Sequence, residues 1–174
     1  MNSASQEEED RRGGHRKPIK VIFLDVDGVL CCNEESSIEK DKLNALEYIC
    51  KATGAFICIS SDWRLYPTKK RELTYALKQL KLKIIGSTPS CDRFARPREI
   101  IGFITVFNAK MNREEAEGKS NVPKITAFCC IDDRFLEAEE GGERLLGHCV
   151  RTSMDTGLTM DLANSAINIL NGKV

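Results

Sequence analysis

A short apolar segment that ends in two carboxylates most restricts what this chain can fold into. Val21–Leu24 is followed by Asp25 and Asp27, separated by one residue, and then by Gly28. A run that is apolar at every position indicates a strand buried on both faces of a sheet. Carboxylates at the exit of such a strand are costly to desolvate unless they are paired or bind a cation. The segment therefore predicts a functional site at the end of a buried strand.

Further apolar runs alternate with amphipathic helical segments along the rest of the chain. Strands are expected at residues 20–24, 55–59, 82–85, 125–131 and 148–151. Wholly apolar strands that alternate with helices are typical of a parallel sheet covered on both faces. We predict an α/β fold, a doubly wound, Rossmann-like parallel sheet of about five strands, over residues 18–174.

The helix boundaries follow from local signals. Ser36 with Glu39 predicts a capping box that opens the first helix, and Gly54 is expected to end it. Pro67 and Pro97 are expected to open the next two helices, and Thr159 to cap the last. Residues 110–123 are polar and are expected to form an exposed loop.

Composition limits the class of protein. The chain has 174 residues, enough for one domain with a core, and its 26 Lys and Arg balance its 26 Asp and Glu. No apolar run approaches the roughly 20 residues needed to span a bilayer, so no membrane partner is expected. Residues 1–17 are charged, polar and without a hydrophobic segment, and are expected to form a disordered tail rather than a secretory signal.

Eight cysteines raise the question of disulfides or zinc. Without a signal peptide, reduced thiols and a cytoplasmic location are the expectation. The two Cys-Cys pairs lack the spacing of a zinc knuckle. The cysteines are Cys31, Cys32, Cys50, Cys58, Cys91, Cys129, Cys130 and Cys149.

Polar side chains follow four of the expected strands. In an open α/β sheet, ligands bind at the carboxyl ends of the strands. Carboxylates suit Mg²⁺, whereas hydroxyls and arginines suit phosphoryl oxygens. The pattern predicts a phosphate-ester site with a divalent cation. The residues are Asp25 and Asp27; Ser60, Ser61, Asp62 and Arg64; Ser87, Thr88, Arg93, Arg96 and Arg98; and Asp132, Asp133 and Arg134.

Other chemistries fit the sequence less well. Asp-x-Asp-Gly also occurs in calcium loops, but no further acidic residue follows until Glu34. Cys58 and Arg64 match the Cys-x5-Arg spacing of cysteine phosphatases, but the loop between them lacks glycine and Cys58 lies inside an apolar run. Asp132 and Asp133, which end a second buried strand, favour a cation site because two such strand ends would otherwise repel.

The chain resembles the haloacid dehalogenase (HAD) superfamily of phosphohydrolases over residues 19–171. Its motifs are similar to Asp25–Val29, to the strand ending in Ser60 and Ser61, and to the strand ending in Asp132 and Asp133. The segments 59–64, 86–89, 96–100 and 156–159 resemble the smaller branch formed by HAD-type phosphatase domains of RNA-repair proteins.

The resemblance implies roles for individual residues. Asp25 would be the nucleophile that forms an aspartyl-phosphate, and Asp27 the acid and base. Asp25, the backbone carbonyl of Asp27, and Asp132 would hold Mg²⁺, with Asp133 as a further ligand or an outer-shell partner. Ser60 or Ser61 would bind the phosphoryl group. The basic residue of the family would be Arg96, with Arg98 and Arg93 as alternatives.

The expected substrate follows from what the sequence lacks. The segments after Asp27 and between Ser61 and Arg96 leave no room for a cap domain, so an open site is expected. Such a site admits a phosphoprotein or a nucleic-acid end. Basic residues at 69–83 suit nucleic acid, although a solvated helix face is the simpler interpretation. Trp63 could line the entrance or pack in the core. The alternative to an enzyme is an inactive HAD-like binding module.

Overall fold

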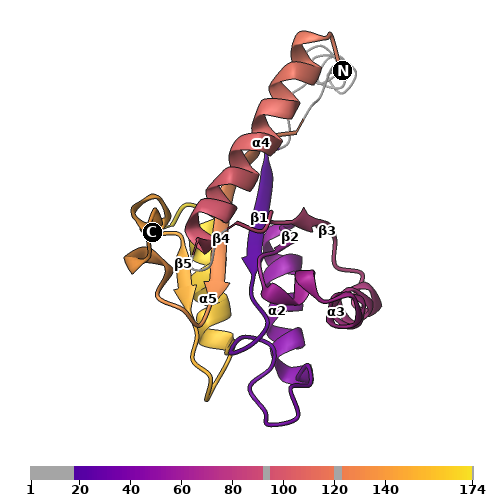
Figure 1. The fold of residues 1–174 in the computed structure, drawn as a ribbon, viewed down its shortest axis with the longest axis vertical. Helices are drawn as coiled ribbons and strands as arrows, with labels where there is room; N and C mark the ends of the chain where they lie inside the picture. The colour runs from indigo at the N-terminus through magenta and orange to yellow at the C-terminus, as the bar shows by residue number, and fades with distance from the viewer. Residues whose placement is uncertain (1–17, 92–94, 120–122, 174) are drawn as a thin grey trace, which may run out of the picture.

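A five-stranded, wholly parallel sheet forms the centre of the molecule. The computed structural model describes residues 18–91, 95–119 and 123–173, so the expected tail at 1–17 lies outside the described residues. The strand order is β3-β2-β1-β4-β5 (Figure 1). The predicted α/β fold is confirmed. The strands are β1 (Ile19–Leu24), β2 (Phe56–Ile59), β3 (Ile84–Ser87), β4 (Ile125–Asp132) and β5 (Cys149–Arg151).

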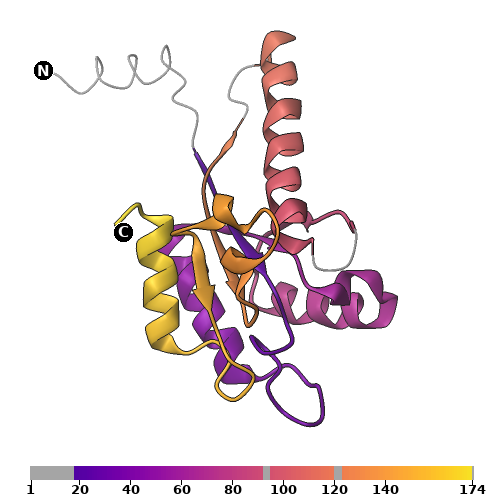
Figure 2. The same cartoon turned by 60° about the vertical axis from the view of Figure 1, so that its left-hand side comes forward.

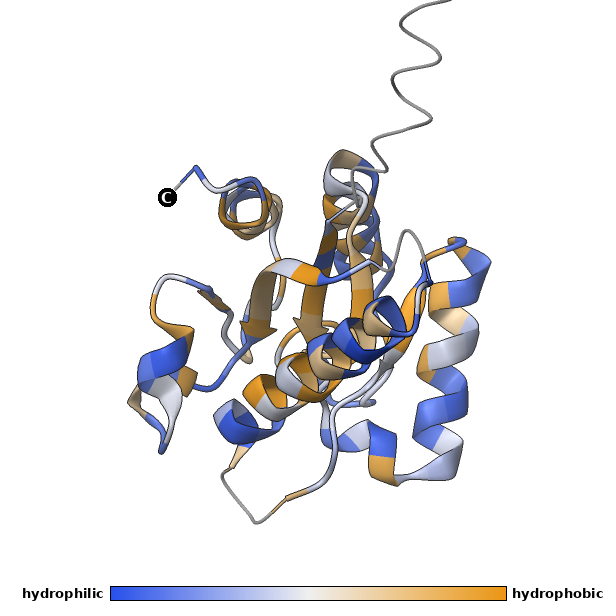
Figure 3. Ribbon diagram, turned by 90° about the horizontal axis from the view of Figure 1, so that it is seen from above, coloured by the Kyte–Doolittle hydropathy of each residue, from blue (hydrophilic) through white to orange (hydrophobic). Residues whose placement is uncertain are grey.

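Helices cover both faces of this sheet (Figure 2). Ile22 and Leu24 of β1 face one core, which α2, α3 and α5 complete, whereas Val21 and Phe23 face a second core beneath α4. The strands are mainly hydrophobic and the helices carry hydrophilic outer residues (Figure 3). None of the described helices is long and apolar enough to cross a membrane. The helices are α2 (Lys40–Thr53), α3 (Pro67–Gln79), α4 (Arg96–Ala116) and α5 (Met160–Leu170), with short 3₁₀ turns η1 (Asp62–Leu65), η2 (Leu136–Ala138) and η3 (Gly142–Leu145).

Two of the predicted helix boundaries are wrong. The capping box does not form, because Ser36 lies outside the helix and the Glu39 carboxylate accepts a hydrogen bond from the Cys32 amide instead, at 2.6 Å. Helix α4 extends to Ala116 through the segment expected to be a loop. Its last two turns consist largely of strong helix formers, and Glu115 pairs with Lys124 at 3.1 Å. Gly54, Pro67 and Thr159 act as predicted.

The third strand begins two residues later than predicted. Its pairing with β2 joins Cys58 to Gly86 and Ile59 to Ser87. A Cβ atom on Gly86 would lie 3.2 Å from the Phe103 ring of α4, so the glycine lets this helix pack close to the strand. The shift places Thr88, not Gly86, at the carboxyl end of the sheet.

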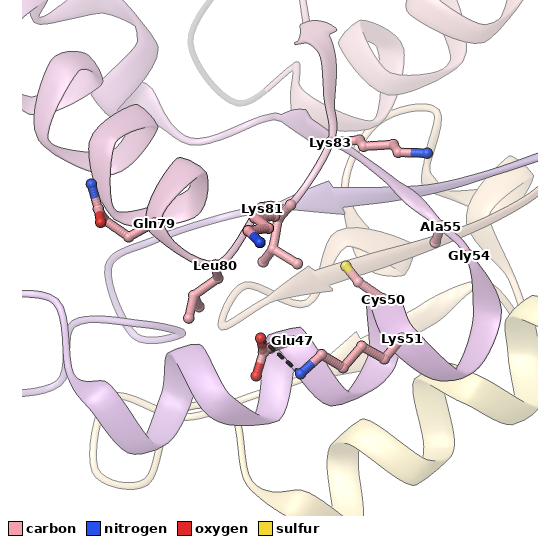
Figure 4. Close-up of a pocket in the computed structure, with 10 residues that line it drawn as sticks. Glu47, Cys50, Lys51, Gly54, Ala55, Gln79, Leu80, Lys81 and Lys83 are labelled. Carbon is pink, nitrogen blue, oxygen red and sulfur yellow. Dashed lines mark ion pairs between the residues drawn. The ribbon is translucent and has the colours of Figure 1, made fainter.

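A hollow between the ends of α2 and α3 lies at the opposite edge of the sheet (Figure 4). Gly54 and Lys83, which line it, come just before β2 and β3. Its charged side chains include an ion pair at 2.9 Å between Glu47 and Lys51. The hollow is therefore separate from the strand ends that carry the predicted chemistry.

Candidate active site

Four strand ends place polar side chains in one row across the sheet. The amide of Asp25 donates to the carbonyl of Ile131, and that of Ser60 to the carbonyl of Leu24, each at 3.0 Å. The residues two positions earlier in β1, β2 and β4 all belong to the core beneath α4. Since strand side chains alternate, the strand-end residues point to the same face. The row consists of Asp132, Asp25, Ser60 and Thr88.

Arg96, the first residue of α4, reaches this row from above. Its Nη1 donates to Asp25 Oδ2 at 2.6 Å and to Asp132 Oδ2 at 2.8 Å. All three side chains are buried. Burial opposes the charge of the guanidinium, but Asp25 and Asp132 outweigh it and hold the pKa of Arg96 above its ordinary value. The cation therefore compensates both carboxylates.

The other two candidate arginines do not share this position. Arg98 is exposed and pairs with Glu140 on the outside of the molecule. Arg93 lies outside the described residues. Of the three arginines considered from the sequence, Arg96 is thus the one that the structure brings to the carboxylates.

Three carboxylates can converge on a single cation. Oxygen atoms of Asp25, Asp132 and Asp133 lie within 4.8 Å of one another. Burial, together with the charge of Asp25, raises the pKa of Asp132 to about 7 and also raises that of Asp133. Three hard oxygen donors held against their own repulsion fit Mg²⁺. The predicted contribution of the Asp27 backbone carbonyl stays a prediction.

Gly28 makes room for this cluster. It has φ of +71°, and a Cβ atom there would lie 2.7 Å from Cβ of Asp133. Its carbonyl accepts a hydrogen bond from Thr152 Oγ1 at 2.7 Å. The glycine of the Asp-x-Asp-Gly sequence is therefore required by a close approach between two strand-end loops.

The elevated pKa of Asp132 gives the protein a pH-dependent response to cations. A carboxyl whose folded pKa exceeds its unfolded value binds more protons in the folded state, so it lowers stability as the pH rises from about 4 to 7. A divalent cation reverses this effect because it favours the ionised carboxylate. We expect Mg²⁺ to raise the melting temperature more at pH 8 than at pH 6, measured by scanning fluorimetry against EDTA.

Asp132→Asn is the matched control for this experiment. It removes the titrating group and should flatten the pH dependence of the Mg²⁺ response. An equal Mg²⁺ response at both pH values in the unmodified protein would contradict the expectation.

Asp27 has a different environment from the other carboxylates. It is exposed, and its two oxygens accept from the indole Nε1 of Trp63 at 3.0 and 3.1 Å. Trp63 itself is buried, with Lys69 Nζ 4.6 Å from its ring centre. The entrance role considered for Trp63 is thus wrong, and core packing is the correct alternative. The contact with Asp27 was missed because the two residues are far apart in sequence.

The two serines after β2 are not equivalent. Ser61 Oγ accepts from the Trp63 amide at 3.2 Å and caps η1. Ser60 Oγ is buried, and no described residue hydrogen-bonds to it. Thr88 Oγ1, which sequence analysis left without a role, is in the same condition. Because buried hydroxyls normally find partners, Ser60 and Thr88 are free to bind a ligand.

A buried arginine outside the predicted site holds its loops together. Arg64 donates to the carbonyls of Ser60, Ser61, Thr88 and Pro89 at 2.8 to 3.1 Å. It also pairs with Glu99 of α4 at 2.7 Å. The ends of β2 and β3 and the start of α4 are therefore fixed to one side chain. The sequence showed Arg64 after the strand but not its partners.

This arrangement removes the cysteine-phosphatase alternative. Arg64 is occupied by backbone carbonyls, and Cys58 is fully buried within β2. Burial raises the pKa of the Cys58 thiol to about 12, so it is not a nucleophile near neutral pH.

A parallel sheet whose two central strands end in buried carboxylates, with an arginine from the next helix between them, defines a HAD-type domain. A model of the HAD domain in Swiss Army Knife RNA repair proteins matches residues 21–163, and the chain belongs to this family. Searches of curated proteins and of solved structures found no match. Membership indicates a hydrolase with phosphatase-type activity.

Proposed function

We propose that the protein is a Mg²⁺-dependent phosphatase that hydrolyses a phosphomonoester through an aspartyl-phosphate. The observation that carries the proposal is the cluster of Asp25, Asp132 and Asp133 with Arg96 between the first two. Such a group has the charge and the hard oxygen donors that a phosphoryl group and a divalent cation require together.

The cation would be held by Asp25, Asp132 and Asp133, with the Asp27 carbonyl as a further ligand. Mg²⁺ supplies positive charge that offsets the repulsion between the carboxylates and the phosphoryl oxygens. Arg96 adds a fixed positive charge, and Ser60 a free buried hydroxyl. These groups orient the phosphoryl group toward Asp25.

The two aspartates of β1 divide the chemistry. A carboxylate oxygen of Asp25 attacks phosphorus, the bond to the ester oxygen breaks, and protonated Asp27 gives its proton to that oxygen. Asp27 then takes a proton from water as the water oxygen attacks the aspartyl-phosphate. Inorganic phosphate leaves and Asp25 is regenerated. The exposure of Asp27 suits this role, because its proton must reach both substrate and solvent.

The open site suits a bulky substrate. Asp25 and α2 are separated by a single loop, and a 3₁₀ turn, α3 and β3 fill the chain between Ser61 and the segment before Arg96. A phosphorylated nucleic-acid end and a phosphoprotein both fit this openness. The description of the matched family as RNA repair domains favours the nucleic-acid end.

A direct assay tests the proposed activity. We expect hydrolysis of p-nitrophenyl phosphate with Mg²⁺ and none in excess EDTA. Competition by phosphorylated oligonucleotides and by phosphopeptides then separates the two substrate classes. Absence of hydrolysis with Mg²⁺, Mn²⁺ and Co²⁺ would instead favour the binding module.

Trp63→Phe tests whether the indole positions Asp27. Hydrogen bonds to charged groups contribute roughly 1.5–3 kcal/mol, so we expect kcat to fall about tenfold or more with a smaller change in KM. In an Asp27→Asn background the same substitution should cost little further activity, because the contact is already altered. Equal losses in both backgrounds would show that Trp63 acts through packing alone.

A further inference from the structure

A groove runs along one face of α3, outside the carboxylate site. Its lining residues recur at intervals of three or four, which places them in a single stripe along the helix. They are Pro67, Lys70, Arg71, Thr74, Tyr75 and Lys78. At 1.5 Å per residue the stripe is about 16 Å long. It could therefore accommodate several consecutive units of an extended chain.

The groove lies in the most basic part of the described structure. Residues 66–83 contain six basic side chains and one acidic, Glu72, although the whole chain has no net charge. Lys70, Arg71 and Lys78 are exposed. Within the described ranges, no ion pair neutralises any of these three. Such a positive stripe attracts a polyanion.

Exposed aromatic rings accompany these charges. Tyr75 lies in the groove between Arg71 and Lys78, and 66% of its surface is exposed. Tyr66, at the start of α3, is 58% exposed. Aromatic rings between cationic side chains are the combination that binds single-stranded nucleic acid, where bases stack and phosphates pair with lysine and arginine. An acidic peptide would use the charges but not the rings.

The groove leads to the carboxylate site. Arg64 lines the groove and also a neighbouring hollow, which Tyr66, Asp62 and Arg96 line as well. Arg96 is the residue that bridges Asp25 and Asp132. A strand on α3 could thus extend past Tyr66 to the site without crossing another element.

We propose that the α3 groove binds the backbone of a single-stranded nucleic acid, with a base stacked on Tyr75 and the strand end directed toward Arg96. The binding itself is independent of the proposed phosphatase activity. The direction of the strand end rests on that activity.

Fluorescence anisotropy with a labelled oligonucleotide ending in hydroxyl groups measures the binding alone, since this probe has no phosphate monoester to hydrolyse. We expect the double substitution Lys70→Glu and Lys78→Glu to weaken binding at least about tenfold and to reduce the slope of log K against log salt by about one. Tyr75→Ala should weaken binding about tenfold at every salt concentration.

Lys173→Glu supplies the charge-matched control. Lys173 is exposed after α5, which packs against β4 and β5, away from α3. It should bind the probe like the unmodified protein, and melting temperatures establish that every variant is folded. Equal affinities for the control and the double variant would overturn the proposal. Competition by polyglutamate as strong as by unlabelled oligonucleotide would also overturn it, in favour of an acidic protein partner.

The two proposals can fail separately. Binding that depends on Lys70, Lys78 and Tyr75, without any phosphatase activity, would keep the groove and remove the enzyme. Phosphatase activity on p-nitrophenyl phosphate, with no binding of the oligonucleotide, would do the opposite.

Discussion

Asp25→Asn should reduce phosphatase turnover by about 10³-fold or more, because an amide cannot form the aspartyl-phosphate on which the proposed reaction depends. The substitution keeps the size of the side chain and leaves an oxygen that can accept from Arg96. The loss should therefore appear in kcat with the fold intact. Steady-state hydrolysis of p-nitrophenyl phosphate and circular dichroism measure the two quantities.

Two further measurements make this expectation specific. Asp161→Asn, at an exposed position in the first turn of α5, should retain full activity. Rapid acid quench with a radiolabelled phosphoester should trap hydroxylamine-sensitive label on the unmodified protein and none on Asp25→Asn. Unchanged turnover in Asp25→Asn would refute the covalent mechanism.

Arg96→Met should destabilise the metal-free protein by about 3–5 kcal/mol, the cost of leaving buried charges without their partner. Asp25 and Asp132 are 5% and 2% exposed, so water cannot replace the guanidinium. A domain is stable by only about 5–15 kcal/mol, so this is a large fraction. Mg²⁺ should recover part of the loss because it offsets the same carboxylates. Urea unfolding with Mg²⁺ and with EDTA measures both effects.

The same variant separates the two jobs of Arg96. If the guanidinium also binds the phosphoryl group, Mg²⁺ should restore stability without restoring turnover. Arg98→Met is the matched control, since Arg98 pairs with Glu140 at the surface and such pairs contribute about 0–1 kcal/mol. Equal stability of Arg96→Met and the unmodified protein in EDTA would show that the buried pair is not needed for charge compensation.

Part of the site could be predicted because it is local in sequence. Asp25 and Asp27 follow β1 directly, and Asp132 and Asp133 occupy the end of β4 and the position after it. Strand order and parallel direction then bring them to one edge. The choice between Ser60 and Ser61 could not be made, because it depends on the turn after β2, where Ser61 caps η1. The choice of Arg96 needed the position of α4 over the sheet.

The sequence by itself determined the alternation of buried strands and helices and the carboxylates at their ends. These features depend on the residue types within one segment. The tertiary structure alone decided that Trp63 binds Asp27, that Arg64 joins two loops to Glu99, and that Arg96 compensates Asp25 and Asp132. Each of these contacts joins residues far apart in the chain. Their energies depend on burial and distance, which exist only once the helices have packed on the sheet.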